Sequence, residues 1–156
     1  MHNVVISDTT CLILLHKIGH LDLLHKIYNN VIITPEVAKE FSESLPIWIK
    51  IEIVKDTKYQ EFLETQVDFG EASSIALAKE MDSPLLLLDD LKARKLAGKL
   101  NLKYTGSLGV INKAKQLGII DAVKPLIDKL LITDFRISEN IIHEFLKLNN
   151  EFVASY

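Results

Sequence analysis

The chain has 156 residues, of which 48% are hydrophobic and 25% are charged, proportions typical of a globular protein rather than a disordered or fibrous one. This length predicts one domain spanning residues 1–156. A net charge of −3 argues against a protein that coats nucleic acid non-specifically, because such proteins are basic. The single cysteine excludes an internal disulfide framework and a zinc site built from cysteines.

No apolar run in the sequence is long enough for a membrane helix. The longest, Cys11–Leu15 and Leu85–Leu88, fall far below the roughly 20 residues that a spanning helix needs. The first three residues, Met1–Asn3, carry no cationic leader. We therefore expect a cytoplasmic protein without a signal peptide and without membrane contact.

Short apolar runs and helical patterns alternate along the first two thirds of the chain. Polar caps mark several helix starts, among them Thr9, Thr10 and the pair Thr34-Pro35. In chain order we predict a strand at Val4–Ile6, helices at Cys11–Ile18 and Leu21–Tyr28, a strand at Val31–Ile33, a helix from Pro35, an edge strand at Ile51–Val54, a helix at Gly70–Met81, a strand at Leu85–Leu88, a helix at Leu91–Leu100, a strand at Lys103–Thr105, and helices at 106–116, 122–131 and 138–148.

This alternation is typical of a parallel sheet wrapped by helices. We predict a three-layer α/β/α fold with a central parallel sheet of about four strands. A helical C-terminal extension is expected from about residue 121. No internal repeat or long linker divides the chain.

Acidic residues follow two of the predicted strands. Asp8 follows Val4–Ile6, and the pair Asp89-Asp90 follows Leu85–Leu88. Ligands of open α/β sheets bind at the carboxyl ends of the strands, so two central parallel strands would bring these carboxylates to one edge. Clustered like charges repel, and such clusters commonly hold a cation. The alternative is that each acid only caps the helix that follows it.

Two predicted helices add further acids. Glu71 lies in the first turn of its helix, where the macrodipole favours a carboxylate, and helical spacing points it toward the core. Glu40 lies beside the apolar Phe41. Together with Glu36 and Glu43, it also fits a solvated acidic stripe on the helix surface.

Other chemistries are weakly supported. The sequence has no Gly-rich phosphate loop and no nucleophile elbow. Thr10 stands where a phosphatase with an aspartyl nucleophile at Asp8 needs a second acid. His16 and His20 are four residues apart, but Lys17 stands where a zinc protease has Glu, so ordinary histidines are the expected interpretation.

Six segments, in order along nearly the whole chain, resemble the PIN-domain family. They are Ile6–Ile13, Pro35–Glu40, Gly70–Ala72, Leu88–Ala97, Gly106–Val110 and Phe135–Ser138. The last three segments are similar to the branch of that family that comprises nucleic-acid-binding proteins and the toxins of toxin–antitoxin pairs. Each motif is weak by itself, whereas their order along the chain is fairly specific.

The resemblance implies a ribonuclease that uses Mg²⁺ or Mn²⁺ held by carboxylates. Carried over by position, the acids expected in catalysis and metal binding are Asp8, Glu40, Glu71 and, from the pair after the strand, Asp89 or Asp90. Asp90 is favoured for catalysis, because Ala93 and Leu96, three and six residues beyond it, lie on the apolar side of the next helix.

The resemblance also implies substrate contacts from Thr10, Arg94 and Ser107. Thr10 matches a small hydroxyl residue that accompanies the first acid, and the forked guanidinium of Arg94 suits a phosphate. One position departs from the family pattern. Many PIN nucleases place a further acid after the next strand, where this chain has Gly106-Ser107. The departure leaves open whether one or two metal ions bind and whether catalysis is efficient.

These features together predict an endoribonuclease that cleaves single-stranded RNA and is the toxin of a toxin–antitoxin pair, with a cognate antitoxin protein as partner. A homodimer is expected from the resemblance and because the Cys11–Ile18 helix is apolar on most of its circumference. The alternatives are a non-catalytic RNA-binding or regulatory module, and a different Mg²⁺-dependent enzyme of phosphate chemistry on the same scaffold.

Overall fold

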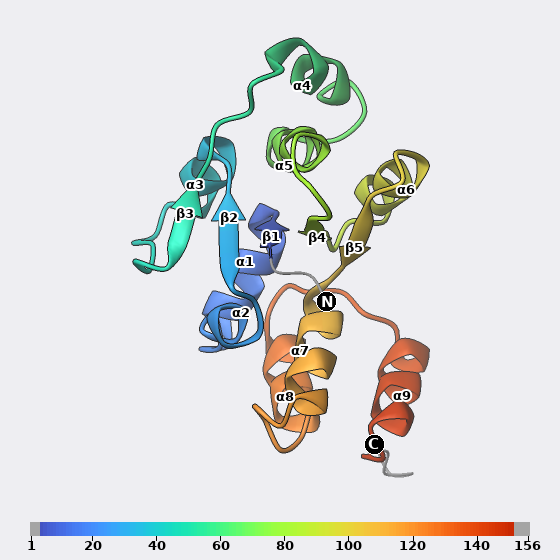
Figure 1. The fold of residues 1–156 in the computed structure, drawn as a ribbon. Helices are drawn as coiled ribbons and strands as arrows, with labels where there is room; N and C mark the ends of the chain where they lie inside the picture. The colour runs from blue at the N-terminus through green and yellow to red at the C-terminus, as the bar shows by residue number, and fades with distance from the viewer. Residues whose placement is uncertain (1–3, 152–156) are drawn as a thin grey trace.

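A computed structural model describes residues 4–151 of the chain (Figure 1). Within these residues, five parallel strands form one sheet in the order β3-β2-β1-β4-β5. The strands are β1 (Val4–Ser7), β2 (Asn30–Ile33), β3 (Ile49–Ile51), β4 (Leu85–Leu87) and β5 (Lys103–Thr105). The helices are α1 (Thr9–Lys17), α2 (Leu23–Ile27), α3 (Pro35–Phe41), α4 (Thr57–Leu63), α5 (Phe69–Lys79), α6 (Leu91–Lys99), α7 (Ser107–Gln116), α8 (Lys124–Ile132) and α9 (Glu139–Leu148).

The sheet separates two hydrophobic clusters, as a three-layer α/β/α fold requires. Successive strand residues point to opposite faces, so Val5 joins one cluster and Ile6 the other. The same alternation places Leu87 with Val5 and Leu86 with Ile6. Helices α1, α2 and α7 cover the first face, and α5 and α6 cover the second (Figure 1). The predicted α/β fold with a central parallel sheet is therefore confirmed, with five strands.

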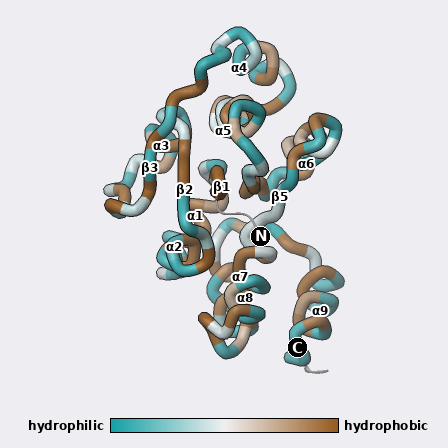
Figure 2. Tube along the Cα trace, in the orientation of Figure 1, coloured by the Kyte–Doolittle hydropathy of each residue, from teal (hydrophilic) through white to brown (hydrophobic). Residues whose placement is uncertain are grey.

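Strand β1 lies between β2 and β4 at the centre of the sheet. Its residue Ile6 pairs with Leu86 of β4, and both side chains are fully buried. The hydrophobic residues of β1 and β2 are visible as brown tube in Figure 2. Because β1 and β4 run parallel and in register, they end at the same edge, where the Asp8 N–H donates to the Leu87 carbonyl at 3.0 Å. This pairing fixes the position of every acid that follows either strand.

The edge strand β3 and the helix α4 differ from the sequence-based expectations. The edge strand was predicted at Ile51–Val54, but β3 spans Ile49–Ile51, because its pairing with β2 covers only these residues and Ile53 beyond it is 75% exposed. Helix α4 was not predicted. It buries only Gln60 and Leu63, so it lacks an apolar stripe, and its clearest signal is the cap formed by Asp56, which accepts from the Tyr59 N–H at 3.1 Å.

The C-terminal helices α8 and α9 are present as the sequence predicted, and they contribute to the first hydrophobic cluster through Leu130 and Leu146.

The apolar residues of α1 are covered by the same chain: Cys11, Leu12 and Leu15 are fully buried. The apolar character of α1 therefore does not by itself require a second copy. Among the helices of residues 4–151, none has the length and hydrophobicity needed to cross a membrane.

Replacing Ile6 by Ala should lower the free energy of unfolding by about 2 to 5 kcal/mol, because it opens a cavity in a fully buried position of the central strand. Ile51→Ala on the edge strand is the matched control, since Ile51 is 49% exposed, and it should cost less than about 1 kcal/mol. Urea denaturation measures both. Equal losses for the two variants would contradict this assignment of the central and edge strands.

Candidate active site

Asp8 is a buried carboxylate at the junction of β1 and α1. Its Oδ1 accepts the Cys11 N–H at 2.9 Å. Asp8 therefore caps α1, which is the alternative to metal binding that the sequence left open. Its Oδ2 accepts the Asp89 N–H at 3.4 Å, and only 1% of the residue is exposed. An ordinary helix cap does not need such burial, because capping residues commonly lie at the surface. Capping alone therefore does not account for Asp8.

Burial raises the pKa of Asp8 to about 7, well above the ordinary aspartate value. The main cause is the loss of hydration, and the nearby Asp89 carboxylate raises the pKa further. The hydrogen bond from the Cys11 N–H opposes both effects, because it favours the charged form. A positive charge close to Asp8 would therefore stabilise its ionised form.

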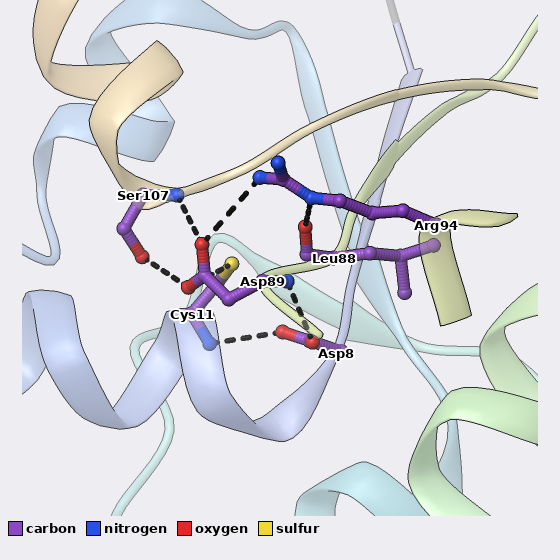
Figure 3. A network of polar contacts seen from close by, with 6 residues as sticks. All are labelled: Asp8, Cys11, Leu88, Asp89, Arg94 and Ser107. Atoms are coloured by element: carbon purple, nitrogen blue, oxygen red, sulfur yellow. Dashed lines mark hydrogen bonds and ion pairs between the residues drawn. The ribbon is translucent and has the colours of Figure 1, made fainter. Parts of the chain in front are cut away.

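Asp89 is held by a network of polar contacts from three different elements (Figure 3). Its Oδ1 accepts the Ser107 N–H at 2.9 Å, and its Oδ2 accepts the Ser107 hydroxyl at 2.6 Å. The Cys11 thiol donates to the same Oδ2 at 3.1 Å. The Arg94 guanidinium forms an ion pair with Oδ1 at 3.8 Å. Asp89 therefore has little rotational freedom beside Asp8.

Arg94 is anchored at two points. Its Nε–H donates to the Leu88 carbonyl at 2.6 Å, and its guanidinium carbon lies 5.8 Å from the centre of the Tyr104 ring. Gly106 makes this arrangement possible, because a Cβ there would collide with the Arg94 guanidinium and with Asp89 Oδ1. The predicted phosphate contact of Arg94 is thus compatible with a partly exposed side chain, but part of the guanidinium is already engaged.

Glu71 is the second buried carboxylate, with 7% of the residue exposed. It closes a capping box with Asp68, which accepts the Glu71 N–H at 2.9 Å. Burial raises the pKa of Glu71 to about 8, and the carboxylates of Asp68, Asp90 and Asp8 raise it further. The prediction that Glu71 points inward is confirmed. Asp68 was not predicted, although its Asp-x-x-Glu spacing to Glu71 is a recognisable capping signal.

Glu40 and Asp90 reach the same edge of the sheet from more exposed positions. Thr9 directly follows Asp8 in the chain, and its hydroxyl donates a hydrogen bond to Glu40 Oε1 at 2.8 Å. Gly70 permits this approach, because a Cβ at that position would collide with Glu40 Oε1. Asp90 caps α6 by accepting the Ala93 N–H at 3.0 Å. The structure therefore places all four predicted catalytic acids around the carboxyl ends of β1 and β4.

The predicted substrate-contacting residues lie in different surroundings. Thr10 is exposed and lines a hollow of about 340 Å³ together with Lys17, Asp89 and Asp90. Ser107 is fully buried, and its hydroxyl is directed to Asp89. A second hollow of about 460 Å³ is also lined by Phe135 and Arg136, and Arg94 lines it as well. Phe135 and Arg136 belong to the Phe135–Ser138 segment of the sequence, but no role was predicted for them.

The donor chemistry of these residues suits a divalent cation. Carboxylate oxygens are the ligands that Mg²⁺ and Mn²⁺ prefer. The Asp8 carboxylate also raises the pKa of Glu71, an effect that a nearby cation would oppose. Within residues 4–151, however, no group of three or more His, Cys, Asp or Glu side chains is arranged so that it could hold a metal ion. The acids fit the ion in chemical type and in location, without forming a closed coordination shell.

Residues 4–151 match the DUF3368 family model, whose description is a PIN domain. No curated protein and no solved structure matches the chain.

Asp8→Asn should make the metal-free protein less sensitive to alkaline pH. In the unfolded chain Asp8 loses its proton near pH 4, whereas in the folded protein the proton is retained to about pH 7. Between these values the folded state binds more protons, so the free energy of unfolding falls as the pH rises. The neutral Asn should therefore be more stable than Asp at pH 8, by roughly 2 to 4 kcal/mol.

Urea denaturation in EDTA at pH 5 and pH 8 measures this difference. Asp56→Asn is the matched control, because Asp56 also caps a helix but lies on α4, outside the acid cluster. It should retain the pH dependence of the wild type. The same dependence in the Asp8→Asn variant would show that Asp8 is not the group responsible.

Proposed function

The chain belongs to the PIN-domain family, a fold typical of nucleases, and we propose that it is a metal-dependent endoribonuclease that hydrolyses single-stranded RNA. The observation that carries the proposal is the pair of buried carboxylates, Asp8 and Glu71, at the carboxyl edge of the sheet. Both have a raised pKa, so both are costly to keep charged without a cation. A fold that keeps such groups together has a use for them beyond stability.

We propose that Asp8, Glu40, Glu71 and the Asp89-Asp90 pair hold Mg²⁺ or Mn²⁺. When bound, such an ion neutralises negative charge on the phosphodiester and lowers the pKa of water. Asp8 contributes a carboxylate fixed by the rigid end of β1, and Glu71 contributes one fixed by the first turn of α5. Thr9 orients Glu40 through its hydroxyl, and the exposed Thr10 and Arg94 supply polar contacts for substrate.

The two acids of the Asp89-Asp90 pair face different neighbours. Asp89 raises the pKa of Asp8, whereas Asp90 raises that of Glu71. Asp89 is also positioned by Ser107, which stands where many PIN nucleases have a further acid. We infer that Ser107 acts by orienting Asp89, because its hydroxyl is buried, and that its predicted contact with substrate is indirect.

The narrower assignments follow from the resemblance. We propose a cytoplasmic toxin of a toxin–antitoxin pair, neutralised by a cognate antitoxin, in which residues 1–156 form one domain. Shared packing of α8 and α9 in the first hydrophobic cluster supports the domain assignment. The homodimer also remains a prediction. It follows from the resemblance rather than from α1, whose apolar residues are covered by the same chain.

Cleavage of single-stranded RNA in Mn²⁺ or Mg²⁺ tests the activity. We expect Asp8→Ala to reduce the rate by about a hundredfold or more, and EDTA to abolish cleavage by the wild type. Asp56→Ala, which removes a helix cap outside the site, should cleave at the wild-type rate. Comparing Asp89→Asn with Asp90→Asn identifies which acid of the pair is needed. RNA that is bound but never cut under any divalent metal would favour the non-catalytic module instead.

Divalent cation should also raise the melting temperature of the wild type. Binding relieves the repulsion among the acids and favours the folded state by mass action. The effect should be larger at pH 8 than at pH 6, because the cation competes with the protons that Asp8 and Glu71 hold near neutral pH. Thermal unfolding with and without millimolar Mg²⁺ or Mn²⁺ measures the shift. A melting temperature that is indifferent to both ions at pH 8 would contradict the proposed site.

A further inference from the structure

Two hollows flank the segment that connects α8 to α9. Both are lined by Asp89, Phe135 and Arg136, so this segment crosses the rim of the site next to the acids. The larger hollow measures about 460 Å³, within the range of small-ligand pockets. It extends from Asp89 toward β5 and the start of α9. Neither the connecting segment nor the larger hollow is needed for the proposed metal site.

The charges of the two hollows differ. In the larger one, Arg94 and Arg136 face the single carboxylate of Asp89. In the smaller one, three acids outnumber the two cations, Lys17 and Arg136. Arg136 is exposed, and none of the ion pairs formed within residues 4–151 involves it. The larger hollow is therefore suited to an anion, and Arg136 has its guanidinium available to bind one.

The larger hollow also offers aromatic surface. Tyr104, at the middle of β5, is 42% exposed, and the partly buried Phe135 lines the same hollow. The Arg94 guanidinium carbon lies 5.8 Å from the centre of the Tyr104 ring, within the range of a cation–π interaction. Nucleobases stack on such surfaces without regard to sequence, because every base has a π-face.

We propose that the larger hollow binds one nucleotide of a single-stranded RNA, next to the carboxylates. The base stacks against Tyr104 and Phe135, and Arg136 contacts a phosphate of the same strand. This inference rests on the proposed function in taking RNA as the ligand. It adds a binding subsite built from β5 and the α8–α9 connection, which holds the strand beside Asp89 and so helps to select which phosphodiester reaches the acids.

Fluorescence polarisation with the full-length protein and a labelled single-stranded RNA of about 12 nucleotides tests the subsite. EDTA is included so that no cleavage occurs. Tyr104→Ala should weaken binding by roughly 5- to 150-fold, the effect of losing one base–aromatic stack, and Tyr104→Phe should restore it. Arg136→Ala should weaken binding and reduce its salt dependence, because one phosphate contact is lost.

Lys58→Ala is the matched charge control. Lys58 is an exposed cation on α4, and α4 lies at the opposite end of the molecule from α9 (Figure 1). This variant should bind RNA like the wild type. Photocrosslinking of the wild type with RNA that contains 4-thiouridine supplies a readout that needs no variant. Crosslinks are expected in peptides that contain Tyr104 or Phe135.

The outcomes separate this inference from the proposed function. If wild type cleaves RNA but Tyr104→Ala and Arg136→Ala bind it normally, the subsite is wrong and the nuclease proposal stands. If Tyr104→Ala weakens RNA binding although no metal supports cleavage, the subsite stands and the nuclease proposal is wrong. Crosslinks confined to other parts of the chain would also overturn the subsite.

Discussion

The parallel pairing of β1 with β4 is the constraint on which the site depends. Both strands are buried at the centre of the sheet. Asp8 directly follows β1 and Asp89 lies two residues beyond β4, so the register of the strands brings Asp8 and Asp89 together at one edge. Glu71 meets the same region from α5, where burial and three neighbouring carboxylates disfavour its charge. The sheet thus concentrates negative charge where water is scarce.

The surrounding structure moderates this repulsion without removing it. Backbone N–H groups bind Asp8, and Ser107, Cys11 and Arg94 bind Asp89. Two glycines permit the close approaches that the site needs: Gly70 beside Glu40, and Gly106 beside Arg94 and Asp89. These contacts fix the directions of the acids, and within residues 4–151 no basic side chain forms an ion pair with Asp8. A divalent cation would balance the negative charge of the carboxylates that the surrounding side chains leave uncompensated.

Sequence patterns predicted much of this arrangement. Buried parallel strands produce continuous apolar runs, and an acid that follows such a run lies at the carboxyl edge of the sheet. The strands carrying Asp8 and Asp89, and the inward direction of Glu71, followed from that reasoning. Helix α4 did not, because Thr57–Leu63 has no apolar stripe. The contact between Asp89 and Ser107, 18 residues apart, depends on tertiary packing that spacing does not encode. The same is true of Arg136, which reaches the rim from a connection between the last two helices.

The carboxylates themselves provide the most direct test, because their pKa values report both crowding and cation binding. Carbon-13 NMR of the side-chain carboxyl groups, recorded against pH in EDTA, should give a pKa of about 7 for Asp8 and about 8 for Glu71. Addition of Mg²⁺ should lower both, since a cation favours the charged form. Titration of either group near its ordinary value of about 4, or pKa values unchanged by Mg²⁺, would contradict the account.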